Sequence, residues 1–519
     1  MTELVQSSGN GARVIAERQG WAVRLGYQCD GIHAPFPAAM MQLLHDAMTY
    51  VRRDFLFGAA RMQPDGSKRA VQITRQMLYS CDASGRVLTA AGMLPDLARL
   101  LYAAGVPVEI LDYTPAPPRP DAYVPAWEHL AEQMRWLGMD FRPRQEECLR
   151  VLAQPGCYCG IINAPPAFGK STLLGLACIL FRTARIAVLT KRKDVVATLY
   201  DRLSGMVNDV GRCGGATRVV APRRVTVSTV GSMHKLQDDY DIVFVDEAHE
   251  IVADKSVTTL MRAFSRARRF GFSATPKGRA DGTSARMTYA FGPQIFYMGW
   301  QEATQLGLIV PVQVRWLRLD FVGDPTAPYK SPVSRKRHGI WRHHRRNAAI
   351  AAVARRHDDD QVLILVETVE HALALRKQLP GYIVISDKIS AKDRDEYIRG
   401  GLMDGTEPEM TPAAREQARR AFESAELRHV IATDVWSTGV SFEQLAVLIR
   451  ADGRKSEIKD DQGPGRVVRR HDASGKQLGV IYDCWDQWST GFLDASKIRD
   501  RRYRDKAWER VYIEYSELL

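Results

Sequence analysis

Short apolar runs alternate with helical stretches along most of the chain. Between residues 126 and about 310, the apolar runs are Cys159–Asn163, Ile186–Thr190, Val225–Thr229, Ile242–Val245 and Phe270–Ser273. Near-continuous apolar strands separated by helices are typical of a parallel sheet that is covered on both faces. The pattern therefore predicts an α/β domain over this part of the chain.

A second series of the same kind follows. Its runs are Val362–Val366, Tyr382–Ser386, His429–Thr433, Ala446–Ile449 and Gly479–Tyr482. Ahead of the first series, Gly92–Tyr102 has helical apolar spacing and Val108–Leu111 reads as a short strand. We expect an α/β protein with two tandem parallel-sheet domains, preceded by a small α+β N-terminal domain.

Domain boundaries follow from composition shifts. The proline-rich run Thr114–Pro120 reads as an extended linker. Lys330–Arg346 carries seven Lys and Arg residues and no acidic residue, and a second basic cluster lies at Lys497–Lys506. A solvated hinge and a solvated helix are the usual interpretation, and a nucleic-acid channel is the alternative. The predicted segments are 1–125, 126–310, a basic linker or insertion at 311–345, and 346–519 with a basic C-terminal helix.

Composition narrows the classes of protein. A length of 519 residues suggests about three domains, and 45% hydrophobic with 25% charged residues excludes a mostly disordered chain. The net charge of +12 fits a polyanionic partner. The apolar stretch Ser171–Phe181 falls short of the ~20 residues that a bilayer requires. We expect no membrane association and, since residues 1–10 lack a targeting pattern, a cytoplasmic protein in a prokaryotic or phage-type setting.

The segment Ala164-Pro-Pro-Ala-Phe-Gly-Lys-Ser-Thr172 follows an apolar strand and opens an apolar helix. Backbone N–H groups of such a loop form a concave anion site at the helix N-terminus. Lys170 is placed to reach the β- and γ-phosphates, and the Ser171 hydroxyl to bind Mg²⁺. Ala164 stands where a phosphate loop usually has its first glycine, so an ordinary glycine-containing loop remains the alternative.

Two adjacent carboxylates, Asp246 and Glu247, end the apolar run Ile242–Val245. At the carboxyl end of a strand, Asp246 can hold the Mg²⁺ shell and Glu247 can orient or deprotonate an attacking water. The alternative is an acidic helix N-terminus. The carboxylate pair lies about 75 residues after the phosphate loop, in the same α/β unit, and this position favours the catalytic interpretation.

Two arginines form the third candidate cluster. In the segment Gln462–Arg470, Arg466 and Arg469 stand three residues apart, so on a helix they would share one face. A guanidinium remains charged and binds phosphate through two N–H groups, which suits a finger that stabilises phosphoryl transfer. The alternative for either arginine is a basic surface turn. Gly271–Pro276 supplies the hydroxyls of Ser273 and Thr275 after another apolar run.

Taken together, these segments resemble the superfamily 2 helicases of the DEAD/DEAH type over about residues 134–489. The matching segments, in the order that superfamily uses, are Gly169–Ser171, Thr190–Lys191, Ser228–Thr229, Asp246–His249, Ser273–Thr275, Thr433–Gly439 and Gln462–Arg469. The resemblance implies two RecA-like domains, with ATP and Mg²⁺ as cofactors.

The resemblance also implies roles for individual residues. The residues it assigns to catalysis are Lys170, Asp246, Glu247, Arg466 and Arg469, with Ser171 and Asp246 on Mg²⁺. The residues it assigns to the nucleotide are Arg142, Gln145, Gly169, Lys170, Ser171, Thr172, Gly439 and Gln462. The candidate nucleic-acid contacts are Lys191, Arg192, Thr229, Arg279, Thr368 and Thr438.

The stretch after Ser273 narrows the branch. Residues 277–282, 291–302 and 307–311 resemble the XPB-type group, which includes phage recombination helicases such as UvsW. Arg279 and Asp281 match its Arg-Glu-Asp segment, whereas Ala280 replaces the acid. Gly463 also departs from the arginine often found there. Residues 85–111 resemble the small N-terminal domain of that group, which is linked to DNA-structure recognition.

We therefore expect an ATP-dependent DNA helicase or translocase that acts on forked, branched or R-loop DNA in repair or recombination. The partner would be single-stranded or branched duplex DNA, and the protein a monomer or loose oligomer. An RNA helicase and a double-strand translocase without strand separation are the alternatives. A non-enzymatic binding module is less favoured, because Lys170, Glu247 and both candidate fingers are present.

Overall fold

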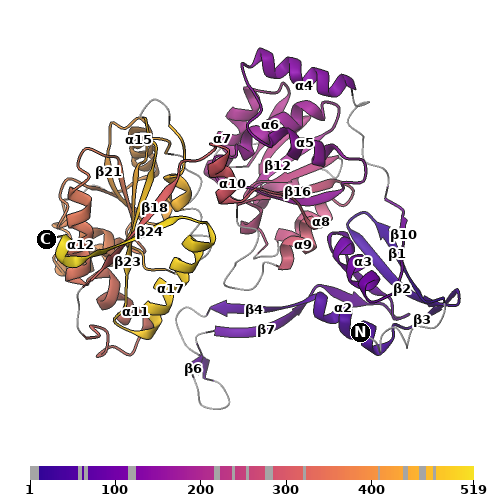
Figure 1. Cartoon of the computed structure of the whole chain (residues 1–519), viewed down its shortest axis with the longest axis horizontal. Helices are drawn as coiled ribbons and strands as arrows, with labels where there is room; N and C mark the ends of the chain where they lie inside the picture. Colours follow the sequence, from indigo (N-terminus) through magenta and orange to yellow (C-terminus); the bar gives the residue numbers. More distant parts are fainter. Residues whose placement is uncertain are drawn as a thin grey trace. The chain divides into compact units, whose positions relative to one another are not determined.

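A computed structural model describes most of the chain, and it separates into two compact units. The described residues are 11–55, 61–62, 68–69, 71–114, 124–214, 223–236, 240–252, 256–274, 285–319, 323–406, 409–436, 442–454, 463–471 and 475–518. The first unit comprises Met1–Ala164 and Gly169–Met298, and the second comprises Pro165–Phe168 and Gly299–Leu519 (Figure 1).

The first unit begins with a small mixed domain. Its sheet has the order β10-β1-β2-β9-β8, with β3 paired to β2, and β1 runs parallel to β10 and antiparallel to β2. The elements are β1 (Arg13–Gln19), β2 (Ala22–Cys29), β3 (Ile32–Ala34), α2 (Ala38–Ala47), β8 (Tyr79–Cys81), β9 (Val87–Ala90), η1 (Ala91–Met93), α3 (Leu94–Ala103) and β10 (Val108–Asp112). The predicted α+β character, the helix and the last strand agree with this structure.

Two strands of this domain form a separate ribbon, which the sequence did not predict. β4 (Thr49–Phe55) pairs with β7 (Val71–Met77) in antiparallel register, and Figure 1 shows them as an extended arm. Two short strands, β5 (Arg61–Met62) and β6 (Lys68–Arg69), pair beyond them. The predicted proline-rich linker after Thr114 lies outside the described residues.

The rest of the first unit is a seven-stranded, fully parallel sheet of order β13-β14-β12-β15-β16-β11-β17. Its strands are β11 (Cys159–Asn163), β12 (Ile186–Thr190), β13 (Val210–Cys213), β14 (Val225–Thr229), β15 (Ile242–Val245), β16 (Arg268–Ser273) and β17 (Gln294–Tyr297). Its helices are α4 (Val124–Trp136), α5 (Gln145–Ala153), α6 (Lys170–Leu180), α7 (Lys193–Ser204), η2 (Val230–Lys235), η3 (Ala248–Glu250), α8 (Ser256–Ala263) and α9 (Ala285–Phe291).

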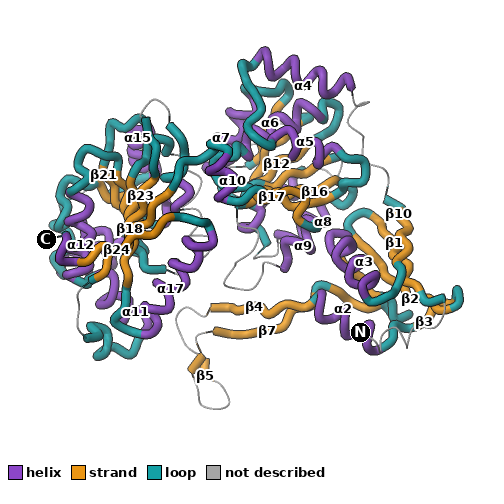
Figure 2. Tube along the Cα trace, in the orientation of Figure 1, coloured by secondary structure: helices purple, strands orange, loops and turns teal. Residues whose placement is uncertain are grey.

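The second unit holds another fully parallel sheet, of order β20-β21-β19-β22-β23-β18-β24, flanked by helices (Figure 2). Its strands are β18 (Val312–Arg318), β19 (Val362–Leu365), β20 (Ile383–Ile385), β21 (His429–Ala432), β22 (Val447–Arg450), β23 (Gly479–Trp485) and β24 (Glu509–Glu514). Its helices are α10 (Trp300–Gln305), α11 (Pro332–Lys336), η4 (Arg337–Trp341), α12 (His344–Arg355), α13 (Val369–Arg376), α14 (Ala391–Arg399), α15 (Pro412–Glu423), η5 (Asp434–Trp436), η6 (Pro464–Arg466), α17 (Thr490–Asp505) and η8 (Tyr515–Glu517). Two tandem parallel-sheet domains are thus confirmed.

The basic segment 311–345 is not a separate linker in the structure. Its first strand, β18, lies between β23 and β24 of the second sheet, and the basic run forms α11, η4 and the start of α12. Acidic side chains neutralise its cations: Lys336 pairs with Glu367 at 2.7 Å and Arg337 with Glu370 at 3.0 Å. The charge run therefore belongs to the second unit.

The predicted C-terminal basic helix is present as α17, but one side of it is buried. Arg499 is fully buried and pairs with Asp483 of β23 at 3.0 Å. Among the described residues, no helix is both long enough and apolar enough to cross a membrane.

Candidate functional site

The predicted phosphate loop joins β11 to α6. Gly169 precedes the helix with φ = +84°, in the left-handed region that favours glycine. The Lys170 ammonium donates a hydrogen bond to the Ala164 carbonyl at 3.2 Å, so the lysine lies over the start of the loop. Ala164 is fully buried and its N–H donates to the Ser273 carbonyl. A helix N-terminus with a lysine folded across it is an arrangement suited to phosphate.

Gln145 and Arg142 lie against this loop. Gln145 is fully buried at the start of α5 and accepts a hydrogen bond from the Arg142 N–H at 3.1 Å. A Cβ on Gly169 would come within 2.8 Å of the Gln145 amide nitrogen and 3.6 Å of Arg142 Cδ. The absence of a side chain at Gly169 therefore allows this close approach. The structure brings three of the predicted nucleotide-binding residues together.

Thr172 and Ser171 are differently placed in the first turn of α6. The Thr172 hydroxyl accepts a 2.6 Å hydrogen bond from Arg202 of α7, so it ties two helices together. Ser171 is only half-buried.

The paired carboxylates follow β15. Asp246 is almost fully buried, and Glu247 has a left-handed φ of +47° at the start of η3. Burial, reinforced by the neighbouring Glu247 carboxylate, raises the pKa of Asp246 to about 7, while the Lys170 ammonium acts in the opposite direction. Asp246 and Lys170 therefore face one small region. A buried carboxylate of this kind is a suitable ligand for a divalent cation.

His249 joins two of the predicted segments, and the sequence analysis assigned it no role. Its Nδ1 lies 2.9 Å from the Ser273 hydroxyl, at the end of β16, and 3.5 Å from Glu247 Oε2. Both His249 and Ser273 are buried. The position of His249 in the segment Asp-Glu-Ala-His was a hint in the sequence that it belongs to the site. Its contact with Ser273 follows only from the strand order β15-β16-β11, which brings the ends of β15 and β16 together. Thr275 lies outside the described residues.

Three candidate nucleic-acid contacts lie at the same edge of the first sheet. Lys191 and Arg192 follow β12, and the Lys191 ammonium donates to the Glu250 carbonyl at 3.1 Å. Burial raises the pKa of Glu250, as does Glu247, whereas Lys191 and Arg192 oppose the shift. Thr229 ends the adjacent strand β14 and donates to the Ser232 hydroxyl at 3.0 Å. These three residues therefore lie at the carboxyl ends of two neighbouring parallel strands.

The second unit contains the predicted arginines in two different settings. Arg466 ends the short turn η6, is 4% exposed, and lies over the Phe442 ring at 5.7 Å. Arg469 lies beyond η6, bridges Ile309 in antiparallel fashion, and is 30% exposed. The prediction that they share a helix face is wrong, because the helical turn ends at Arg466.

The remaining candidates are placed as follows. Thr368 caps α13, where its hydroxyl accepts from the His371 N–H at 3.2 Å. Arg279, Thr438, Gly439 and Gln462 lie outside the described residues.

Two family models match the chain and indicate an ATP-hydrolysing enzyme of the helicase type. Residues 138–278 match the family model "Type III restriction enzyme, res subunit", and residues 345–471 match "Helicase conserved C-terminal domain". The chain belongs to the superfamily 2 helicases, as the order of its motifs predicted. No curated protein matches it.

Solved structures share the architecture at low identity. S. cerevisiae Dbp5 bound to RNA and ADP BeF3 is 12% identical, with a TM-score of 0.52 over 75% of this chain and 94% of that chain. T4 UvsW is 15% identical, with a TM-score of 0.39 over 97% of this chain and 100% of that chain. At these identities the likeness concerns the fold alone.

Proposed function

We propose that this protein is a DNA helicase or translocase that couples ATP hydrolysis to movement on, or remodelling of, forked, branched or R-loop DNA. One observation carries the nucleotide part of the proposal. Lys170 and the buried Asp246 act on each other electrostatically at the edge where Gln145 packs against Gly169. That arrangement combines a phosphate-binding cation, a metal-binding carboxylate and a buried amide.

ATP with Mg²⁺ fits the donor set of the first unit. Bound ATP·Mg²⁺ would supply the phosphoanhydride bond that is broken and a divalent charge beside it. Lys170 and the loop N–H groups would hold the phosphates, and Ser171 and Asp246 the metal. Gln145 and Arg142 would contact the adenine base of the nucleotide. Glu247 would accept the proton of the attacking water. His249, held by the Ser273 hydroxyl, would fix the orientation of the Glu247 carboxylate.

The second unit would contribute guanidinium groups. We propose that Arg469, which is the more exposed of the pair, stabilises the charge that develops on the transferred phosphoryl group. Arg466 is buried against Phe442 and would support the segment that carries Arg469. Gly439 and Gln462 would complete the nucleotide contacts, as the motif order implies.

Nucleic acid would be bound mainly through its phosphates. Lys191, Arg192 and Thr229 would serve in the first unit together with Arg279, and Thr368 and Thr438 would serve in the second. Phosphate contacts carry little sequence information, so binding would be sequence-tolerant and would weaken steeply with salt.

The XPB/UvsW-like branch and the small domain at 1–125 support DNA as the partner. RNA is the second candidate, because Dbp5, which shares the fold, is solved with RNA. We propose a monomer or loose oligomer acting in the cytoplasm, in DNA repair or recombination.

One experiment separates these candidates. ATP turnover is measured with single-stranded, duplex, forked and four-way DNA, and with RNA of the same sequences. We expect the largest stimulation from forked or four-way DNA. Stimulation by RNA alone would contradict it. Strand displacement beside triplex displacement then distinguishes a helicase from a double-strand translocase.

A further inference from the structure

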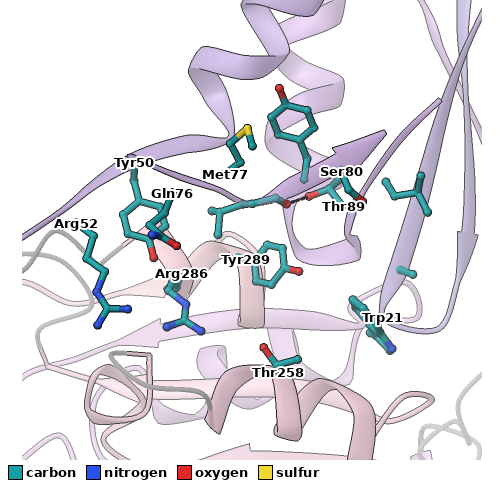
Figure 3. A pocket seen from close by; sticks show the side chains of 14 residues that line it. Trp21, Tyr50, Arg52, Gln76, Met77, Ser80, Thr89, Thr258, Arg286 and Tyr289 are labelled. Carbon is teal, nitrogen blue, oxygen red and sulfur yellow. Dashed lines mark hydrogen bonds between the residues drawn. The ribbon is translucent and has the colours of Figure 1, made fainter. Parts of the chain in front are cut away.

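The first unit contains a cavity that the ATP site does not use. It has a volume of about 690 Å³ and lies where the base of the β4–β7 ribbon meets α8 and α9 (Figure 3). Its size falls in the range of small-molecule and cofactor sites. Three elements distant in the sequence form its walls: the ribbon, the β1–β2 turn with Trp21, and α9 with Tyr289.

Close packing fixes the walls of this cavity. Gly92 sits against α9 so tightly that a Cβ would come within 2.4 Å of the Thr288 carbonyl oxygen. The Ala91 N–H donates to the Trp21 carbonyl at 2.7 Å. Tyr289 packs against the cores of both the small domain and the first parallel-sheet domain. The cavity is therefore preformed, which lowers the entropic cost of binding.

The charge of the cavity is positive. Among the described residues that line it are two arginines, Arg52 of β4 and Arg286 of α9, and no carboxylate. In Figure 3 both guanidinium groups point to the same side. Two guanidinium groups without an acidic residue in the same wall favour a phosphate group over a cation or a neutral ligand.

The remaining lining offers aromatic surface next to that charge. Trp21, Tyr50 and Tyr289 contribute rings, and Gln76 lies directly across the ribbon from Tyr50. Aromatic faces stack with unstacked nucleobases, and an amide can bond with a base edge. A nucleotide carries a base and a phosphate in one molecule and so matches both parts of this lining.

We propose that this cavity binds one nucleotide, with its base against the aromatic rings and its phosphate at Arg52 and Arg286. The inference rests on the proposed function, because the strand on which the motor acts would supply the nucleotide. A free mononucleotide offers the same chemistry, and the experiment distinguishes the two sources. The site would hold an unpaired residue of the strand apart from the ATP site.

The test is a salt titration of binding to a fluorescent oligo(dT). The double variant Arg52→Gln/Arg286→Gln is compared with the control Arg99→Gln/Arg135→Gln, which removes two exposed arginines from α3 and α4 of the same unit. Both arginines contact the same phosphate, so loss of that contact should reduce the slope of log K against log salt by about 0.7. The control should leave the slope unchanged. Equal slopes in the two double variants would overturn the proposal.

A second measurement uses the wild-type protein and so does not depend on folding of a variant. Oligo(dT) containing 4-thiothymidine is crosslinked, and the peptides are mapped. We expect crosslinks in the peptides with Tyr50 or Tyr289, and crosslinks confined to other peptides would contradict the proposal. Competition by millimolar dTMP in the Lys170→Ala background assigns the source. If dTMP competes with the crosslinked oligo(dT), the cavity binds a free nucleotide. If the crosslinks persist in the presence of dTMP, the cavity binds a nucleotide of the strand.

Failure of this inference is distinguishable from failure of the proposed function. Neither Arg52 nor Arg286 belongs to the ATP site, so hydrolysis without nucleic acid should be the same in the double variant and the wild type. A wild type that hydrolyses ATP and binds oligo(dT), combined with equal slopes, removes only the cavity proposal. A wild type whose hydrolysis no nucleic acid stimulates removes the function.

Discussion

The imidazole Nδ1 of His249 lies 2.9 Å from the hydroxyl oxygen of Ser273 and thereby connects the acidic segment after β15 to the end of β16. The same nitrogen lies 3.5 Å from the Glu247 carboxylate. Because both partners of the bond are buried, breaking it leaves polar groups that water cannot satisfy. The hydroxyl therefore holds the imidazole in place beside Glu247.

Ser273→Ala should lower the kcat of ATP hydrolysis roughly tenfold, less than the 10²–10⁴ that a general base contributes. The KM for ATP should change little, because the Ser273 hydroxyl bonds with His249. The measurement is steady-state ATP turnover. Thr226→Val, which removes a buried hydroxyl of β14 bonded to the Arg223 carbonyl, is the control. A raised KM with an unchanged kcat would contradict the positioning role.

Asp246→Asn should stabilise the nucleotide-free protein at high pH while abolishing Mg²⁺-dependent hydrolysis. Burial raises the pKa of Asp246 to about 7, so the folded state binds its proton more tightly than the unfolded state. The free energy of unfolding of the wild type therefore falls as pH rises from about 4 to about 7, and the full cost remains above that. The variant lacks this cost.

The measurement is Tm without nucleotide at about pH 8 and about pH 5. The gain in Tm of Asp246→Asn over wild type should be larger at the higher pH. Asp140→Asn, at an exposed carboxylate of the same unit, should show no such gain. A gain that is equal at both pH values would disprove the assignment.

The two arginines of the second unit should respond differently to alanine. Arg469→Ala should leave Tm nearly unchanged, because its side chain is partly exposed. If Arg469 is the finger of the proposed mechanism, the same variant should lower ATP turnover about 10³-fold. Arg466→Ala should lower Tm, because it removes a buried guanidinium from the Phe442 ring. Full turnover in Arg469→Ala would transfer the finger role to another residue.

Two neighbouring arginines of α12 should differ in their contribution to stability. Arg346 is fully buried, pairs with Asp486 at 2.8 Å and donates to the Ala451 carbonyl. Arg346→Leu leaves a buried carboxylate and should cost about 3–5 kcal/mol in the free energy of unfolding. Arg345→Leu, at an exposed side chain, should stay within about 0.5 kcal/mol. Urea unfolding measures both, and equal losses would argue against the buried pair.

The strands that were predicted most accurately are those whose residues are almost all apolar. β11, β12 and β15 have the bounds that the sequence indicated, because burial on both faces favours a nearly continuous apolar run. β24 was missed, since it mixes charged and apolar residues and most of its side chains are partly or fully exposed. Its place beside β18 depends on pairing across almost 200 residues.

The site was predictable where its chemistry is local. Lys170 at a helix start and Asp246 after a strand follow from neighbouring residues. The partners of the basic segment do not, because Glu367, Glu370 and Asp486 are brought to it only by the folded second sheet. The cavity beside the β4–β7 ribbon could not be predicted from the sequence either, because its lining comes from segments some 270 residues apart.

The sharpest test of the proposed motor is ATP hydrolysis by wild type, Lys170→Ala and Glu247→Gln, measured with ATP binding on the same samples. We expect nucleic-acid-stimulated turnover in the wild type. Lys170→Ala should lose turnover with an unchanged circular-dichroism spectrum, and Glu247→Gln should bind ATP tightly and turn it over very slowly. Wild-type turnover in Lys170→Ala would contradict the assignment of the phosphate loop and with it the motor.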